Sequence, residues 1–546
     1  FLIMAKIYGL FFGAHGQSTT LIVDGEVKYA IEDERITRKK AGNSWWDAPI
    51  HSLKVIEEKT GILLEDADII SISDPTLLYL VQYKNGDVNE PEDEMTIFRE
   101  RLIKLKDKIQ WVEHHEAHAY STYYNSGFTD KTLVLTSDGG SYEKEYGTIW
   151  LAENGKMNKV HSIPIREQGS IANLWFYACF QYGWKGTKDE GKIMGMAGHG
   201  EYNEYLYNSF KSCLTYRGNL QFTHPENGMA VEFVYSRLAE EGWFEGQKNR
   251  QDFAFNLQKY TEDVFMEYLT DISALYPEYR NLSVAGGVFA NVKLNQVINE
   301  SGLYDNMFVC PAMGDSGISF GAAIKSSIDV GDWKGVKKLK DAFLGLEYSQ
   351  KEIDDHAVTL KVISQDLDYS KVGSLIHEGN IIALFNGRFE FGPRALGARS
   401  VMVRPTDAET HEILNTRLER HEIMPFAPFI MSEYANIVFD IPRSHHTAEF
   451  MTMCYTVRDE WVDRIPAVVH KVDNTGRPQI VYKHNNPVFW NILNEYNKIS
   501  GIPVMLNTSF NGHGEPIINT PEQAFAHLIK GTIDYLVAGS KIYKKL

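Results

Sequence analysis

Apolar and polar residues alternate at the start of the chain in a pattern that predicts three strands joined by two turns. Residues 6–33 read KIYGLFFGAHGQSTTLIVDGEVKYAIED. The pair Asp24-Gly25 lies between two alternating apolar runs and is a strong signal for a β-hairpin. Residues 132–163 repeat this plan, with Asn154-Gly155 closing the second hairpin. We therefore predict two copies of one three-stranded unit, each followed by helical sequence.

Two later segments also place a glycine-rich turn between a strand and a helix. Residues 282–298 read LSVAGGVFANVKLNQVI, and residues 309–327 read VCPAMGDSGISFGAAIKSS. Such turns let the backbone approach a ligand closely, and the following helix presents free N–H groups. The four segments favour a duplicated α/β fold of the actin and sugar-kinase type, in which facing turns hold nucleotide phosphates. Two unrelated hairpins are the alternative.

The pattern changes after about residue 346, where helical sequence leads into a new set of strands. Residues 329–345 carry charge runs typical of a surface connection. Residues 380–392 (NIIALFNGRFEFG) then favour a strand, and residues 408–420 (AETHEILNTRLER) favour a helix. The expected domains are residues 1–350 and residues 351–546.

Composition and charge narrow the classes of partner. The 546 residues carry a formal net charge of -17, which disfavours nucleic acid and anionic membranes as partners. Lys6 interrupts the apolar N-terminal run, unlike a signal peptide, and no apolar stretch approaches the ~20 residues of a membrane span. The four cysteines lie far apart without a C-x-x-C motif. We expect reduced thiols and a cytoplasmic location.

The segment VEHHEAHAY contains the sharpest candidate for a metal site. His114 and His118 are four residues apart, so on a helix they share one face and suit a single ion. Asp138 in TSDGG and Asp315 in GDSG add carboxylates in glycine-rich turns. Two imidazoles and two carboxylates suit Fe(II), Mn(II) or Zn(II) better than Ca(II). A polar helix face with ordinary hydrogen bonds is the alternative, and His115 is a further candidate ligand or supporting group.

Arginines concentrate in the second domain, in GRFEFGPRALGARSVMVRP at residues 387–405. Guanidinium groups fixed on a glycine- and proline-containing loop suit phosphate or carboxylate binding. In so acidic a chain they favour a small anionic ligand. In residues 505–524, MLNTSFNGHGEPIINTPEQA, short polar side chains follow a strand and suit a ligand cradle. Surface ion pairs and a self-capped polar turn are the respective alternatives.

Together these motifs resemble the NodU/CmcH family of carbamoyltransferases. The resemblance runs almost the whole chain, from the first hairpin to residues 505–524. Its most specific parts are GRFEFGPRALGARS, the H-x-E-x-H run at residues 114–118, the GGVFAN turn and EGKIMGMAGHG at residues 190–200.

The resemblance implies a first domain of the ASKHA type (duplicated, actin- and sugar-kinase-like), similar to the enzyme that transfers threonylcarbamoyl to tRNA. It implies a second, YrdC-like α/β domain. That domain would join carbamoyl phosphate to ATP, with Mg(II) as the partner of ATP, and leave carbamoyl adenylate. The first domain would then pass the carbamoyl group to a hydroxyl of a small molecule. Sugars, antibiotics and hydroxymethylated nucleosides or nucleotides all suit the acceptor position, and a homodimer is left open.

The resemblance also implies roles for individual residues. His15 matches the general base for the acceptor hydroxyl, a task that suits a neutral histidine; a turn histidine bonded to the backbone is the alternative. The metal ligands would be His114, His118, Asp138 and Asp315, with iron the usual ion. The nucleotide-binding positions would be Lys192, Gly139, Gly140, Gly286, Gly287 and Asn291. The carbamoyl phosphate and adenylation positions would be Arg388, Arg394, Arg417, His470, Arg477, Asn507, Ser509 and Asn511.

The sequence departs from the family pattern at Gly16, where an aspartate is more common, and at Arg417, where relatives often carry lysine. Acceptor walls are expected in residues 40–60, with Trp45 and Trp46, and in residues 200–260. Three other functions stay open at this level: a sugar-kinase-like ATPase, a non-catalytic nucleotide-binding subunit, and threonylcarbamoyl transfer to tRNA. The negative net charge of the chain disfavours threonylcarbamoyl transfer to tRNA.

Overall fold

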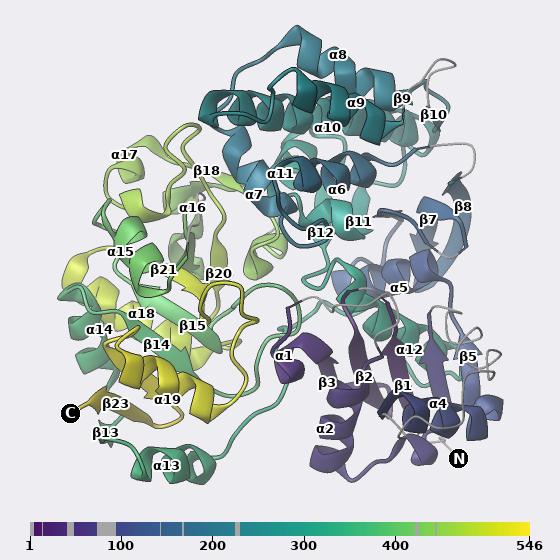
Figure 1. The fold of residues 1–546 in the computed structure, drawn as a ribbon. Helices are drawn as coiled ribbons and strands as arrows, with labels where there is room; N and C mark the ends of the chain where they lie inside the picture. Colours follow the sequence, from purple (N-terminus) through teal and green to yellow (C-terminus); the bar gives the residue numbers. More distant parts are fainter. Residues whose placement is uncertain are drawn as a thin grey trace. The chain divides into compact units, whose positions relative to one another are not determined.

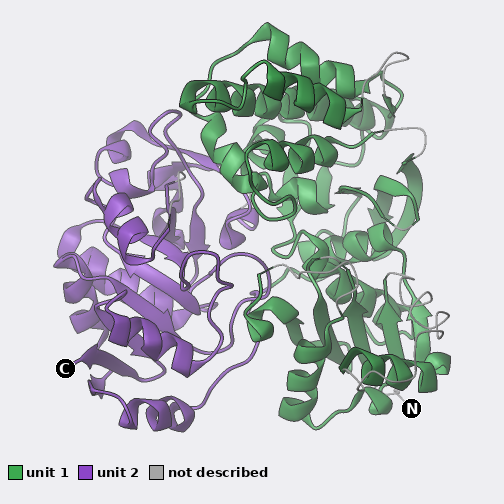
Figure 2. Cartoon of the chain, viewed as in Figure 1, with its two compact units in different colours: residues 1–339 green, residues 340–546 purple. Residues whose placement is uncertain are grey.

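The chain divides into two units, residues 1–339 and residues 340–546 (Figure 2). The computed structural model describes residues 5–13, 15–40, 48–73, 94–141, 143–165, 169–223, 230–420, 425–442 and 445–546. Both units combine helices with sheets, so the mixed α/β class expected from the sequence is confirmed. Among the helices in these described ranges, none is both long and apolar enough to cross a membrane.

Unit 1 contains two five-stranded sheets with the same strand order. The strands are β1 (Lys6–Phe11), β2 (Ser18–Val23), β3 (Glu26–Glu32), β4 (Ile69–Ile72), β5 (Ile109–Trp111), β6 (Thr132–Ser137), β7 (Glu145–Glu153), β8 (Lys156–Pro164), β11 (Asn281–Ala285) and β12 (Asn306–Val309). The first sheet has the order β3-β2-β1-β4-β5, and the second has β8-β7-β6-β11-β12. Each is an antiparallel meander extended by two parallel strands. The predicted duplication is therefore confirmed.

Both predicted hairpin turns adopt the backbone that their sequence favours. Asp24 and Gly25 have φ values of 55° and 67°, and Asn154 and Gly155 have 51° and 74°. Two consecutive residues in the left-handed region are what a type I′ turn requires, and its twist matches that of the flanking strands. These turns set the register of β2 on β3 and of β7 on β8.

Helices α5 (His114–Ser126) and α12 (Ile318–Asp329) pack against each other in the core of unit 1 (Figure 1). α12 lies on β1 and β2 of the first sheet, and α5 lies on β6 and β11 of the second. Small residues make both contacts close: a Cβ on Gly321 would lie 1.8 Å from the carbonyl oxygen of Ala117. A Cβ on Gly9 of β1 would lie 2.0 Å from the carbonyl oxygen of Ser319. These two close contacts fix the positions of the two sheets of unit 1 relative to each other.

The other described α-helices of unit 1 belong to two groups. The first part of the unit contains α1 (Asp33–Thr37), α2 (Ile50–Thr60) and α4 (Glu94–Lys104). The later part contains α6 (Ile171–Gln181), α7 (Glu190–Ala197), α8 (Glu204–Cys213), α9 (Val231–Glu240), α10 (Gln247–Leu275) and α11 (Val292–Glu300). The long α10 contacts α7, α8 and α11. A short hairpin of β9 (Thr215–Tyr216) and β10 (Phe222–Thr223) lies beside it.

Unit 2 is built on one eight-stranded mixed sheet. Its strands are β13 (Val362–Asp366), β14 (Ile382–Phe385), β15 (Arg399–Val403), β16 (Ala427–Met431), β20 (Gln479–Val481), β21 (Val504–Ser509), β22 (Tyr535–Ala538) and β23 (Lys541–Lys545), in the order β13-β23-β22-β14-β15-β21-β16-β20. A small sheet contains β17 (Phe439–Asp440), β18 (Tyr455–Val457) and β19 (Thr475–Gly476). The described helices are α13 (Gln350–Val358), α14 (Tyr369–His377), α15 (Thr410–Arg417), α16 (Ala435–Val438), α17 (Asp459–Val462), α18 (Pro487–Ser500) and α19 (Pro521–Lys530).

Replacing Gly9 by alanine is expected to destabilise the protein, because the added methyl group would overlap the carbonyl of Ser319. Overpacking of this kind costs roughly 1–3 kcal/mol. Urea denaturation followed by circular dichroism measures the change. The matched control is Gly191→Ala in α7, where a Cβ meets nothing within 4 Å. That substitution should stabilise the helix by about 0.5–1 kcal/mol, and equal stability of the two variants would contradict the packing argument.

Candidate functional site

The four predicted metal ligands converge in unit 1. His114 and His118 come from the first turns of α5, Asp138 directly follows β6, and Asp315 lies in the turn before α12. One ligand atom from each residue can be chosen so that all lie within 4.8 Å of one another. The Nε2 atom of His118 is 3.3 Å from Asp138 Oδ2 and 3.7 Å from Asp315 Oδ1, and His114 Nε2 is 3.8 Å from Asp315 Oδ1. The helix crossing described above is what brings these segments together.

This cluster fits a divalent transition metal. Both histidine Nε2 atoms are buried, and neither forms an aligned hydrogen bond within the part of the chain that the structure describes. Donor atoms about 2.1 Å from a tetrahedral ion lie about 3.4 Å apart, which is close to the spacings found here. A donor set of two imidazoles and two carboxylates suits Fe(II), Mn(II) or Zn(II).

Charges in the cluster are strongly coupled. Burial alone would lower the pKa of His118, but the carboxylates of Asp138 and Asp315 outweigh it and raise the pKa to about 9. Burial would likewise raise the pKa of Asp138, yet His118, His114 and the N–H group of Gly287 hold it well below its usual range. Without a metal, the cluster therefore retains a proton on His118 at neutral pH. A metal ion binds by displacing that proton.

His115 supports the ligand histidines and is not one of the four clustered donors. The Nε2–H group of His115 donates to the carbonyl of Glu145 at 3.1 Å, because a carbonyl oxygen only accepts. Burial and the neighbouring histidines lower the pKa of His115 well below its ordinary value, so the ring is neutral. Its Nδ1 atom then accepts the hydroxyl of Thr136 at 2.9 Å. Thr136 Oγ1 also bonds to Thr148 Oγ1 at 2.7 Å, and Thr148 Oγ1 accepts the indole N–H of Trp150 at 2.8 Å.

The predicted general base, His15, lies beside the same cluster. Its Nε2 atom is 3.6 Å from Asp315 Oδ2, and its side chain is 30% exposed, so solvent reaches it. Position 16 has φ 74°, and a Cβ there would lie 2.8 Å from the backbone nitrogen of Ser316. Glycine thus suits this turn, because an aspartate at position 16 would be strained and crowded.

The predicted nucleotide turns are bonded directly to a predicted metal ligand. The carboxylate of Asp138 accepts the N–H group of Gly139 at 2.7 Å through Oδ1 and that of Gly287 at 3.0 Å through Oδ2. Gly286 has φ 106°, and a Cβ there would lie 2.1 Å from the carbonyl oxygen of Ser137. Glycine is therefore required for the two turns to approach each other. The ligand cluster and both glycine turns form one connected site, which also includes Gly140.

The other two nucleotide-binding candidates have structural partners of their own. Asn291 caps α11 by accepting the N–H group of Leu294 at 3.0 Å, and its Nδ2 atom donates to Gln258 Oε1 at 2.8 Å. Lys192 on α7 pairs with Asp189 at 2.7 Å and lies over the ring of Trp184. Asn291 therefore shapes the turn through its side chain. The nucleotide contacts of both residues stay predictions.

In unit 2, buried side chains hold the backbone of residues 395–399, next to Arg394. Glu390 Oε1 accepts three N–H groups of this loop at 2.7–3.1 Å, from Leu396, Ala398 and Arg399. Three further side chains donate amide N–H groups to its carbonyls. They are Asn507 to Ala395, Gln479 to Leu396, and Asn486 to Gly397. Nearly every backbone polar group of the loop is thus bonded, and the half-buried Arg394 is attached to a rigid support.

Arg420, rather than Arg417, bonds to the polar segment at the end of β21. The buried guanidinium of Arg420 donates to Thr508 Oγ1, and to the side chains and carbonyls of Ser509 and Asn511. Asn511 also donates to the carbonyls of Gly512 and Glu515. These predicted ligand-binding side chains therefore support the turn as well.

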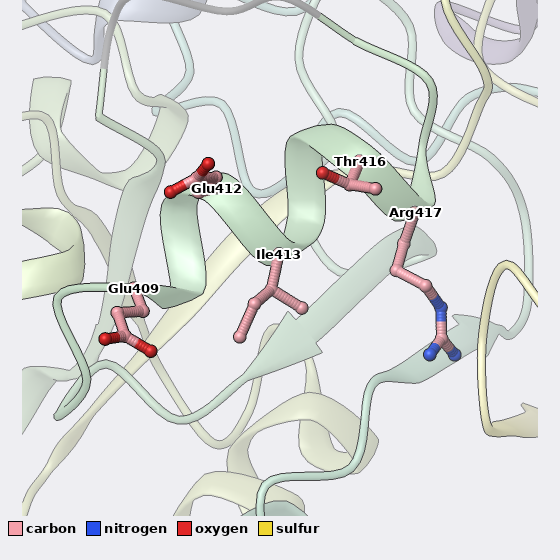
Figure 3. A pocket seen from close by; sticks show the side chains of 5 residues that line it. All are labelled: Glu409, Glu412, Ile413, Thr416 and Arg417. Carbon is pink, nitrogen blue, oxygen red and sulfur yellow. The ribbon is translucent and has the colours of Figure 1, made fainter.

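The remaining candidates of unit 2 lie in different local settings. Arg388 donates to the carbonyls of Leu344 and Gly345, and His470 pairs with Asp473 at 3.0 Å. Arg477 lies two residues before Gln479, which contacts the rigid loop. Arg417 pairs with Asp534 at 2.6 Å at the end of α15. Arg417 lines a hollow of about 350 Å³ together with Glu409, Glu412, Ile413 and Thr416. Figure 3 shows these five side chains at and around α15.

Several supporting residues escaped the sequence analysis. Glu143 accepts the N–H group of His114 at 3.3 Å, and Ser170 donates to the carbonyl of Asp138 at 2.6 Å. Glu390 and Gln479 were also missed as site residues, and Arg420 was not assigned to the site. Gln479 and Arg420 act on segments distant in sequence, so no local spacing reveals them. Glu390 acts on residues 396–399 nearby, but no motif marks it as an acceptor for their N–H groups. Of the expected acceptor walls, residues 41–47 (with Trp45 and Trp46) and 224–229 lie outside the described residues.

Comparison with known proteins identifies the family to which this chain belongs. Residues 94–324 match the carbamoyltransferase N-terminus family, and residues 373–545 match the carbamoyltransferase C-terminus family. Nodulation protein NolNO of Sinorhizobium fredii is 30% identical over 553 residues, covering 97% of this chain and 79% of the relative. Nodulation protein U of Rhizobium fredii is 26% identical over 527 residues, covering 92% and 84%. The chain belongs to the carbamoyltransferase family of NodU-like enzymes, as its motifs predicted.

Solved structures align less closely. Full-length HypF in its phosphate- and nucleotide-bound form aligns with 60% of this chain and 56% of its own length, at a TM-score of 0.33 and 13% identity. The activator of the 2-hydroxyisocaproyl-CoA dehydratase from Clostridium difficile gives a TM-score of 0.31 at 12% identity, covering 60% and 95%. At such scores the description of the fold rests on the repeated sheet order within unit 1.

The metal-free protein is expected to lose stability as the pH rises from 7 to 9. The pKa of His118 is raised to about 9 in the folded state, so its stabilising charge is complete below its unfolded value of 6.5 and disappears as the pH passes 9. The slope is at most about 1.4 kcal/mol per pH unit. Urea denaturation of metal-stripped protein at several pH values measures it. A His118→Gln variant should show a flatter profile, and identical slopes would rule out this linkage.

Removing the carboxylate of Glu390 should strongly destabilise unit 2. Glu390→Ala leaves three buried N–H groups without their acceptor, and each unsatisfied group costs about 1–3 kcal/mol. Glu390→Gln keeps an acceptor oxygen in place and should retain most of the stability. Thermal denaturation of the two variants compares them. A loss of similar size in both would show that the charge, and not the acceptor geometry, matters.

Proposed function

We propose that this carbamoyltransferase is an ATP-dependent O-carbamoyltransferase with two reaction sites. Unit 2 would form carbamoyl adenylate, and unit 1 would transfer its carbamoyl group to a hydroxyl of a small molecule. The observation that carries the proposal is the convergence of His114, His118, Asp138 and Asp315 within 4.8 Å, joined to two glycine turns. A site of this kind can hold the phosphate of a nucleotide and polarise the group attached to it.

The adenylating role falls to unit 2, with a YrdC-like fold as part of the proposal. Carbamoyl phosphate, ATP with Mg(II) and one water would give carbamoyl adenylate, pyrophosphate and phosphate. Arg394 extends from a loop whose backbone is bonded by Glu390, Gln479 and Asn507. A preorganised guanidinium is suited to neutralising phosphate charge without reorganisation. Arg388, Arg417, His470, Arg477, Ser509 and Asn511 are assigned to the same site.

The transfer role falls to unit 1, with an ASKHA-type fold as part of the proposal. A divalent metal, with iron favoured by the resemblance, would be held by the four clustered residues and would supply Lewis acidity toward the carbamoyl adenylate. The turns with Gly139, Gly140, Gly286 and Gly287 would receive the nucleotide, assisted by Lys192 and Asn291. His15, near Asp315 and open to solvent, would accept the proton of the acceptor hydroxyl as that oxygen attacks the carbamoyl carbon. AMP would leave.

The decisive experiment measures pyrophosphate release and carbamoylated product together. Pyrophosphate release from ATP should depend on carbamoyl phosphate, and mass spectrometry should detect an acceptor heavier by one carbamoyl group. ATP hydrolysis that is independent of carbamoyl phosphate would favour a sugar-kinase-like ATPase instead. Nucleotide binding without turnover would favour a non-catalytic subunit.

Two substitutions should separate the two sites. His118→Ala should reduce product formation by at least 100-fold while pyrophosphate release persists, because it removes a metal ligand from unit 1 only. Arg394→Ala should suppress pyrophosphate release first, because it acts on adenylate formation in unit 2. Metal analysis of both purified variants provides the control, with metal lost in the first and retained in the second. Equal loss of both activities in His118→Ala would contradict the two-site scheme.

A further inference from the structure

Three lysines from two distant segments gather in unit 1. Lys40 follows α1, while Lys185 and Lys188 lie in the turn between α6 and α7. The ammonium group of Lys188 donates to the backbone carbonyl of Lys40, so the two segments are in contact. Within the described ranges of the chain, none of the three ammonium groups forms an ion pair with a carboxylate. This is an unusual local excess in a chain of net charge -17.

The lysines are close enough to repel one another. Burial first, and then the charges of Lys185 and Lys40, lower the pKa of Lys188. The acidic groups that act on Lys188 are Glu34 and Asp189, and Asp189 is already paired with Lys192 at 2.7 Å. The carboxylate of Glu190, next in the chain, accepts the N–H group of Thr187. A fold that places like charges together with so little compensation favours an anionic ligand at that point.

The same lysines stand next to the proposed transfer site. Glu190, two residues after Lys188, is a half-buried carboxylate that lies within electrostatic range of His15. On the other segment, the N–H group of Asp33 at the start of α1 donates to the carbonyl of Gln17, two residues after His15. Each of the two lysine-bearing segments is therefore connected to the turn that carries His15, one through Glu190 and the other through Asp33.

We infer that the acceptor of the carbamoyl group is a phosphomonoester, bound through its phosphate by Lys40, Lys185 and Lys188 while its hydroxyl lies at His15. This inference rests on the proposed function and specifies its acceptor. Ammonium groups act as point charges and suit a compact dianion, whereas planar carboxylates pair best with arginine forks. Sugar phosphates and nucleoside monophosphates share this chemistry.

The test compares acceptors that differ only in the phosphate. A nucleoside with its 5′-monophosphate, and a sugar with its phosphate, are incubated with ATP and carbamoyl phosphate, and product is measured by mass spectrometry. The wild-type kcat/KM should be at least tenfold higher for the phosphorylated member of a pair. The combined Lys40→Ala, Lys185→Ala and Lys188→Ala variant should reduce that ratio to about one, mainly through KM. If the nucleoside pair shows the preference, the acceptor is a nucleotide; if the sugar pair shows it, the acceptor is a sugar phosphate.

Matched controls keep the result specific. Lys211→Ala removes an exposed lysine from α8 and should leave the phosphate preference intact. If the triple variant instead slows both members of each pair equally, the lysines serve the adenylate and the inference is wrong. It is also wrong if the wild type shows no preference for phosphate.

A binding measurement covers acceptors that turn over too slowly to assay. Titration calorimetry with inorganic phosphate should give one bound phosphate fewer in the triple variant than in the wild type. Equal stoichiometry would overturn the inference. Failure of the proposed function itself would appear separately, as absence of carbamoyl-phosphate-dependent pyrophosphate release, a reaction that needs no acceptor.

Discussion

The close crossing of α5 and α12 is the contact on which the rest of unit 1 depends. Gly321 lets the two helix backbones approach where any side chain would meet the carbonyl of Ala117, and Gly9 does the same between α12 and the first sheet. Interiors at native density do not yield to an extra methyl group without strain. His114, His118 and Asp315 lie at or just before the first turns of these helices, so a shift of either helix would move His118 and Asp315 apart. The geometry of the histidine–aspartate cluster therefore depends on the packing of α5 against α12.

Much of this arrangement can be predicted from the sequence. The Asp24-Gly25 and Asn154-Gly155 turns, the repeated strands and the i, i+4 pair of histidines are local patterns with a local physical cause. They suffice to predict the duplicated fold. Together with Asp138 and Asp315 in glycine-rich turns, and with the family resemblance, they also indicate the four residues that cluster. The match of both domain families then supplies the reaction class. Prediction works here because each signal is contained within a few residues.

Where side chains bond to distant backbone, the sequence is a poorer guide. The sequence places Asn507 and Asn511 after a strand, as ligand-binding amides often are, but Asn507 lies within β21 and only Asn511 follows it. The amide donors of both bond to protein carbonyls, those of residue 395 and of the turn itself. Arg388 is similarly occupied by carbonyls of the preceding connection. A polar side chain near a site looks the same in sequence whether it meets a ligand or a loop. The distinction depends on long-range packing, which periodicity does not encode.

The shared carboxylate of Asp138 has a thermodynamic consequence. One side chain accepts N–H groups from both glycine turns and also faces His118. Any ligand that displaces or reorients those N–H groups alters the electron density that Asp138 can offer to an ion, and the converse holds with equal free energy. Binding at the glycine turns and binding at the histidine–aspartate cluster are then coupled. The affinity of each site depends on whether the other site is occupied.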